Sequence, residues 1–194
     1  MSRKNRKAWR ARWPHSAENL RFITWLRDRG SLTARLQIHG RFAVRPLHQG
    51  LAVPTLDEAI VLGIRPKRVA WVREVVLLCN DQALVFAHTV LPYRPRGPLT
   101  GWLARLGNRS LGALLFADAG FIRGELFSQR LDARHELFYS AADALQLTKS
   151  TPKSLWARRS CFRYGAQSVL VTEVFSPVLG DGGKNSLDLD CINP

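Results

Sequence analysis

Runs of β-branched and aromatic residues occur in two closely spaced pairs, and they constrain the fold more than any other feature. Residues 69–79 and 83–91 form one pair, and residues 155–164 and 168–175 form the other. Three residues separate the runs of each pair, a spacing typical of a β-hairpin. Parallel strands would need a much longer crossover. The two pairs therefore predict an antiparallel sheet.

The remaining segments add strands and helices without a repeating β-α-β order. Phe42, Val44 and Pro46 alternate with polar or small neighbours, and residues 121–131 also alternate, so both stretches predict strands. Helical spacing predicts helices over residues 17–29, 32–39, 56–62, 99–106 and 110–116, with Ser16 and Ser31 as the caps of the first two. Residues 132–154 are expected to hold a strand near 136–139 and then a polar loop. This order is typical of an α+β fold.

The length of 194 residues and the 46% hydrophobic content suit one domain with a buried core. We expect a basic flexible arm over residues 1–15, a folded domain over 16–177 and a flexible tail over 178–194. No apolar run approaches the roughly 20 residues that span a bilayer, and no apolar stretch follows the basic start as in a secretory signal. The three cysteines form no C-x-x-C pair, so we expect a reducing cytoplasm.

The net charge of +14 allows two interpretations. The protein could bind a nucleic acid or anionic membrane through phosphate contacts, or it could attract a small anionic substrate. Six of the basic residues lie in the N-terminal arm, and the others are scattered along the chain. An arm of this kind is usually solvated. We expect no specific nucleic-acid partner, and peripheral membrane contact by the arm stays open.

Familiar catalytic signatures are missing from the sequence. It holds no P-loop, no G-x-G-x-x-G after a strand and no G-x-S-x-G. Its five histidines are not at metal-ligand spacing, and His88, in the middle of a predicted strand, fits a structural role better than a catalytic base. We therefore expect neither a metal nor a cofactor.

Two charged residues interrupt apolar strand faces. Because side chains alternate along a strand, Arg73 shares a face with Trp71 and Val75. Glu173 shares a face with Val171 and Phe175 in the same way. A charge on such a face needs a partner, because an isolated buried ion is very costly. A ligand site, a structural ion pair between the two, and edge strands that reach water all remain open.

Four segments of the sequence resemble motifs of the chorismate pyruvate-lyase family of ubiquinone biosynthesis, in the family's order. Residues 71–77 resemble W-L-R-E-I-L-L, and residues 107–116 resemble G-x-x-x-L-G-x-x-L-F. Residues 155–160 resemble L-W-G-R-R-S, and residues 170–177 resemble L-L-T-E-L-F-x-P. A weaker match runs over residues 25–33, near W-L-x-x-x-x-S-M-T. The resemblance covers about residues 18–177.

This resemblance implies a cofactor-free lyase that converts chorismate to 4-hydroxybenzoate and pyruvate. It implies a single antiparallel β-sheet of about six strands, with helical flaps around residues 30–40 and 99–116 over a buried ligand pocket. Arg73 would hold the carboxylate of the aromatic acid and Glu173 would meet its 4-hydroxyl group. Leu111 and Leu32 would line the site, although the family has methionine where this chain has Leu32.

Chorismate carries a second carboxylate, on its enolpyruvyl arm, which needs another cation. Arg123, Arg158 and Arg159 are the candidates by motif position, with structural pairing to Glu74 or Glu125 as the alternative. A monomer is expected. The competing function is a non-catalytic domain that binds an aromatic acid, because effector domains of some bacterial transcription regulators share the family's fold.

Overall fold

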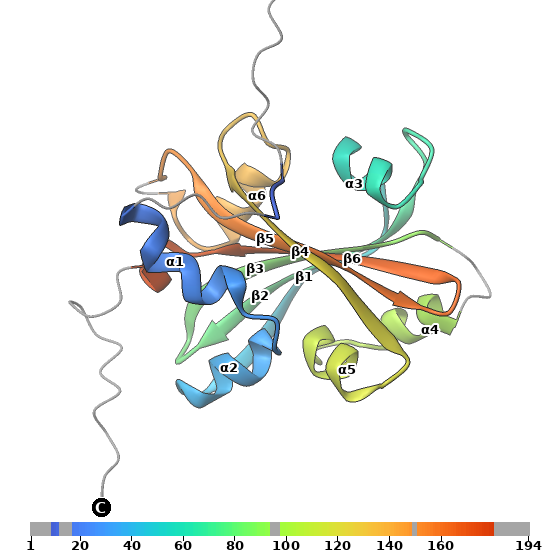
Figure 1. Ribbon diagram of the computed structural model, residues 1–194, viewed down its shortest axis with the longest axis horizontal. Helices are drawn as coiled ribbons and strands as arrows, with labels where there is room; N and C mark the ends of the chain where they lie inside the picture. The colour runs from blue at the N-terminus through green and yellow to red at the C-terminus, as the bar shows by residue number, and fades with distance from the viewer. Residues whose placement is uncertain (1–8, 12–16, 94–97, 149–150, 181–194) are drawn as a thin grey trace, which may run out of the picture.

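The computed structural model describes residues 9–11, 17–93, 98–148 and 151–180 and has a six-stranded antiparallel sheet at its centre (Figure 1). The strand order across the sheet is β1-β2-β3-β6-β5-β4. The strands are β1 (Phe42–Ala52), β2 (Ala70–Cys79), β3 (Gln82–Leu91), β4 (Phe121–Leu131), β5 (Leu155–Tyr164) and β6 (Gln167–Phe175). The predicted α+β class and single antiparallel sheet are confirmed.

Both predicted hairpins are present, and they meet at the middle of the sheet. Asn80 and Asp81 connect β2 to β3 with positive φ angles of 49° and 63°, as a tight hairpin turn of matching twist requires. Gly165 has a φ of 55° in the β5–β6 turn, where a glycine adopts this conformation without strain. β3 then pairs with β6, so side chains from both hairpins face a common space.

Helices cover both faces of the sheet. They are α1 (Ala17–Arg27), α2 (Leu32–Ile38), α3 (Leu56–Val61), α4 (Pro98–Ala104), α5 (Leu111–Ala117) and α6 (Leu137–Ala144). We call the face with Val75 and Phe175 the pocket face; α1, α2, α4 and α5 pack there. The face with Val76 and Val174 is the back face, which α3 and α6 cover (Figure 1).

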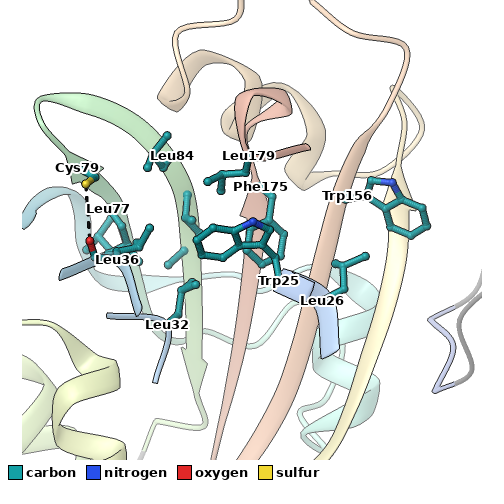
Figure 2. Packing of buried hydrophobic residues seen from close by; sticks show 13 residues of the cluster. Trp25, Leu26, Leu32, Leu36, Leu77, Cys79, Leu84, Trp156, Phe175 and Leu179 are labelled. Atoms are coloured by element: carbon teal, nitrogen blue, oxygen red, sulfur yellow. Dashed lines mark hydrogen bonds between the residues drawn. The ribbon is translucent and has the colours of Figure 1, made fainter. Parts of the chain in front are cut away.

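A cluster around Trp25 fixes α1 and α2 to the pocket face, as Figure 2 shows. Trp25, Leu36 and Phe175 are buried there, and the Cys79 thiol donates a 3.6 Å hydrogen bond to the Leu36 carbonyl oxygen. The Ser31 side chain accepts from the Ala34 backbone N–H and caps α2, as the sequence predicts. The loop between α1 and α2 is therefore held against the sheet.

The prediction of a strand near residues 136–139 is wrong, because this segment begins helix α6. Phe138, Ala141, Ala142 and Leu145 recur at helical spacing, and all four are buried against the back face. The helical spacing was not recognised in the sequence, because the segment begins with Leu-Phe-Tyr, whose aromatic residues favour strands. Burial of the whole stripe against Val76 stabilises the helix more than local propensity opposes it.

The proposed arm and tail are described only in part. Backbone hydrogen bonds of 2.9 and 2.8 Å join Arg10 to Ser128 of β4, so this part of the arm is ordered on the sheet. After Pro177 the chain forms a 3-10 turn, Pro177–Gly180, with Leu179 buried, so this part of the tail is ordered too. The predicted cap Ser16 lies outside the described residues. No helix in the described ranges is long and apolar enough to cross a membrane.

Candidate active site

A cavity lies between the pocket face and the segments that carry α2 and α5. Four charged side chains line it: Arg73, Arg123, Arg158 and Glu173. Three cations and one anion leave a formal excess of two positive charges. Most other lining residues are apolar or small, among them Leu32 and Leu111. This combination suits a compact, partly apolar ligand with two negative charges.

Arg73 reaches the cavity from β2 and is 1% exposed. Its Nε donates to Gln49 Oε1 at 3.2 Å, and its Nη2 donates at 2.9 Å to the carbonyl oxygens of both Gly107 and Arg109. Burial lowers the pKa of Arg73 to about 10, so it stays charged at neutral pH. Among the described residues no carboxylate forms an ion pair with it. The guanidinium is thus held in place with its charge available to a ligand.

Glu173 enters the cavity from β6 and pairs with Arg158 directly opposite on β5. Arg158 Nε donates to Glu173 Oε2 at 2.5 Å, and Arg158 Nη1 donates to the Trp25 and Asp28 carbonyl oxygens at 2.6 and 2.7 Å. Of the alternatives that the sequence left open, the ion pair between Arg73 and Glu173 is not the one formed, because Glu173 pairs with Arg158. Arg158 thus binds the Glu173 side chain, whose oxygens accept hydrogen bonds.

Arg73 and Glu173 reach the cavity from the two strands that flank β3. One strand, β3, separates them, so their backbones are roughly 10 Å apart across the sheet. Arg73 pairs with Thr89 of β3, whereas Glu173 pairs with Ala87 of the same strand. Both side chains line the same cavity. The geometry leaves space for a ring between a cation and a hydrogen-bond acceptor.

Arg123 lines the cavity near the Glu173 side. Its Nε donates to Ser160 Oγ at 3.0 Å, and its Nη1 donates to the Arg29 carbonyl oxygen at 2.7 Å. The guanidinium carbon lies 5.5 and 5.3 Å from the ring centres of Phe116 and Phe162. Burial lowers the pKa of Arg123 to about 10, and the charge of Glu173 partly opposes this. A second charged guanidinium is therefore available at this side.

The two segments that close the cavity touch each other through small polar side chains. Thr33 of α2 and Ser110, just before α5, share a hydrogen bond between their hydroxyl groups, and both line the cavity. A side chain at Gly112 would place its Cβ 3.1 Å from Thr33 Oγ1, so glycine permits this close approach. The expected flaps correspond to these segments.

Arg159 does not line the cavity, which corrects its inclusion among the candidate cations. It follows Arg158 on β5, so alternation turns it to the back face, where its Nη1 lies 2.6 Å from Asp57 Oδ2. Glu74 is not the partner of either arginine. Its carboxylate instead lies 2.9 Å from His88 Nδ1 on the same back face. His88 thus has the structural role that the sequence favours.

Sequence reasoning missed Gln49, Ser160, Thr33 and Ser110, although each touches a predicted site residue or closes the cavity. Gln49 faces Arg73 across the β1–β2 pairing, which only the register reveals. The sequence did contain a signal for Ser160, because this residue lies two positions after Arg158 on the same strand and therefore shares its face. In the described part of the chain, no three His, Cys, Asp or Glu side chains are placed to hold a metal ion.

Solved structures with little sequence identity share the fold. The C-terminal domain of histidine utilization repressor from Pseudomonas syringae pv. tomato is 13% identical with a TM-score of 0.55, over 75% of this chain and 96% of that one. The effector domain of PhnF from Mycobacterium smegmatis is 19% identical with a TM-score of 0.50, over 75% and 88%. At this identity the likeness concerns the fold alone.

Similarity in sequence extends over nearly the whole chain. A probable chorismate pyruvate-lyase of Dechloromonas aromatica is 47% identical over 175 residues, 90% of this chain and 97% of that one. Another from Methylobacillus flagellatus is 44% identical over 171 residues, 87% and 94% of the two chains. The model of the chorismate lyase family matches residues 4–180. The chain therefore belongs to the chorismate lyase family of enzymes.

Proposed function

We propose that the protein converts chorismate to 4-hydroxybenzoate and pyruvate in this cavity, as the first committed step of ubiquinone biosynthesis in the cytoplasm. The observation that carries the proposal is the arrangement of the four charged groups. Arg73 lies on one side of β3, and Glu173, Arg158 and Arg123 lie on the strands of the other side, while most of the other lining residues are apolar or small. Chorismate is a dianion with its ring carboxylate at one end and its 4-hydroxyl and enolpyruvyl ether at the other.

Arg73 is the group proposed to bind the ring carboxylate. Gln49 binds its Nε, and the carbonyl oxygens of Gly107 and Arg109 bind its Nη2. These hydrogen bonds fix the orientation of the guanidinium. A fixed guanidinium loses little freedom when it binds, and a charge-assisted contact in a buried site is strong. Leu32 and Leu111 would contact the ring from the two flaps, because both are buried and line the cavity.

Glu173 is proposed to accept a hydrogen bond from the 4-hydroxyl group. The reaction breaks the C3–O bond, and the C4 hydrogen passes to the methylene carbon of the enolpyruvyl group, which leaves as pyruvate. Loss of pyruvate makes the ring aromatic, so the driving force is intrinsic to the substrate. Fixing the reacting atoms in place can contribute roughly 7–11 kcal/mol in favourable cases. Glu173 would then orient the substrate and need not act as an obligatory base.

Arg123 is the stronger candidate for the enolpyruvyl carboxylate. Arg158 already neutralises Glu173 and is bound to two carbonyl oxygens, and Arg159 lies on the back face. Arg123 is near the Glu173 side, and among the described residues it forms no ion pair. The ether oxygen at C3 is adjacent to the 4-hydroxyl carbon, so the arm and the hydroxyl group would lie on the same side of the cavity.

Incubation of the purified protein with chorismate, followed by product identification, tests the proposal. We expect 4-hydroxybenzoate and pyruvate in equal amounts, at an undiminished rate after treatment with a metal chelator. Binding of chorismate without turnover would instead support the alternative of a non-catalytic aromatic-acid domain. The enzyme relatives that match over most of the chain favour turnover.

A further inference from the structure

The outward side of helix α3 is apolar, although a short surface helix ordinarily turns polar residues to water. Leu56, Ile60 and Val61 are 48, 71 and 46% exposed. Val53 and Val69, at the two ends of the excursion from β1 to β2 that contains α3, are also exposed. Single exposed hydrophobic residues are common, but here five large ones occur within 17 consecutive residues.

Both carboxylates of α3 are used on its inner side. Asp57 accepts hydrogen bonds from Trp9 Nε1 at 2.8 Å and from Arg159 Nη1 at 2.6 Å. Glu58 is 1% exposed, and its Oε2 lies 3.0 Å from the Thr55 backbone nitrogen and 3.3 Å from His88 Nε2. Glu58 is thus buried, and Asp57, whose side chain is 38% exposed, is paired with Arg159, so neither carboxylate of α3 is an unpaired negative charge at the surface.

Basic residues accompany this apolar side. Arg65, Lys67 and Arg68 are exposed in the turn that follows α3, which an Arg68 N–H to Arg65 carbonyl bond of 3.1 Å closes. Trp9 binds Asp57 of α3, and the sequence just before Trp9 holds four more basic residues, Arg3, Lys4, Arg6 and Lys7. Apolar side chains bordered by lysine and arginine suit the interface of an anionic lipid bilayer.

We propose that residues 53–69, the α3 surface, dock the protein on an anionic lipid membrane. A second copy of this chain fits less well, because each copy carries a net charge of +14 and the two would repel. A nucleic acid would gain nothing from exposed leucine, isoleucine and valine. The α3 surface belongs to the back face (Figure 1), so docking leaves the cavity on the pocket face free. The inference goes beyond the proposed function and does not depend on it.

Co-sedimentation with lipid vesicles tests the proposal. We expect the full chain to bind vesicles of phosphatidylcholine mixed with phosphatidylglycerol, to bind pure phosphatidylcholine much more weakly, and to dissociate as salt is raised. The double variant L56Q/I60Q should lower the partition coefficient by roughly tenfold, because two aliphatic side chains no longer enter the bilayer. R65Q/R68Q should weaken binding only to the anionic vesicles.

Matched controls separate the α3 surface from general effects. Ile38→Gln changes an 80% exposed isoleucine on α2 and should leave vesicle binding unchanged. R27Q/R163Q removes two exposed arginines elsewhere and should weaken binding less than R65Q/R68Q. Thermal melts of all variants should be measured to check that each one folds.

Three results would overturn the proposal. One is that the full chain does not bind anionic vesicles at low salt. Another is that L56Q/I60Q binds as the full chain does while a variant lacking residues 1–8 does not, which would assign binding to the N-terminal sequence alone. The third is a dimer in analytical ultracentrifugation that L56Q/I60Q dissociates, which would make the α3 surface a contact between copies.

Discussion

Arg73 and Arg123 both line the cavity, but only Arg123 is proposed to bind a group that the product lacks. Arg123→Gln should therefore raise the KM for chorismate by roughly a hundredfold, about 3 kcal/mol for a lost charge-assisted contact, while the Kd for 4-hydroxybenzoate changes little. Arg73→Gln should weaken the binding of both chorismate and 4-hydroxybenzoate, because both carry the ring carboxylate. Steady-state kinetics and calorimetric titration of the product measure the two effects.

Arg45 provides the matched control for these two substitutions. It is exposed on β1, so Arg45→Gln should change neither the KM nor the product Kd. If Arg123→Gln weakened the binding of chorismate and 4-hydroxybenzoate equally, the second carboxylate would have to bind elsewhere. Besides Arg73, which is assigned to the ring carboxylate, Arg158 would then be the remaining cation of the cavity.

Substitution of Glu173 distinguishes a role in orienting the substrate from a role in proton transfer. Glu173→Gln keeps the size of the side chain and an acceptor oxygen, but it removes the negative charge that Arg158 now binds at 2.5 Å. If Glu173 only orients the 4-hydroxyl, the single-turnover rate should fall by about tenfold or less and chorismate affinity should also fall. Rapid-quench measurement at saturating enzyme gives this rate. Complete loss of chemistry with unchanged affinity would show that the carboxylate is an obligatory base.

At the scale of elements, the contact between α2 and the start of α5 closes the cavity. Thr33→Val keeps the shape of the side chain but removes its hydrogen bond with Ser110. One hydrogen bond is worth about 1 kcal/mol, so 4-hydroxybenzoate should dissociate roughly fivefold faster and inhibit less strongly. Stopped-flow displacement of the product measures this rate. The control Thr24→Val, at an exposed site on α1, should leave the dissociation rate unchanged. An unchanged rate in Thr33→Val would mean that the contact between Thr33 and Ser110 does not limit product release.

The elements that the sequence predicted correctly are those whose signal is local. The alternating runs around Arg73 and Glu173 and the short turns between them predict both hairpins. Alternation also places these two charged side chains on apolar faces. Helix α6 was missed because its buried stripe, which includes Phe138 and Ala141, is meaningful only against the back face that it covers.

Partners that come from distant segments could not be predicted in the same way. Gln49 meets Arg73 only because β1 pairs with β2 in one register. Arg158 binds the carbonyl oxygens of Trp25 in α1 and of Asp28 just after it, which are 130 or more residues away in sequence. Nothing in the order of residues along either segment specifies such contacts, since they depend on how helices dock on the finished sheet.

At the scale of the whole molecule, a buried cluster on the back face links α3 to the central strands. His88 of β3 lies 2.9 Å from Glu74 of β2 and 3.3 Å from Glu58 of α3. Burial alone would lower the pKa of His88, but hydrogen bonds and charges from Glu58 and Glu74 outweigh it and raise that pKa to about 9. At Glu58, burial raises the pKa, but the hydrogen bond and charge of His88, together with hydrogen bonds from Thr55, outweigh it and lower the pKa of that carboxyl.

Folding stability should therefore decrease at alkaline pH. The pKa of His88 is about 9 in the folded protein and near its ordinary 6.5 in the unfolded chain, so the folded state holds this proton more tightly. The resulting stabilisation, on the order of 3 kcal/mol, is complete below about pH 6.5 and is lost as pH rises through 9. The Tm should fall by roughly 5–10 °C between about pH 7 and pH 10.

His88→Gln should start from a lower Tm and lose most of this pH dependence, whereas His48→Gln, at an exposed position on β1, should keep it. A Tm of the unaltered chain that stays constant over this pH range would show that the imidazole is not held as a cation between the two carboxylates.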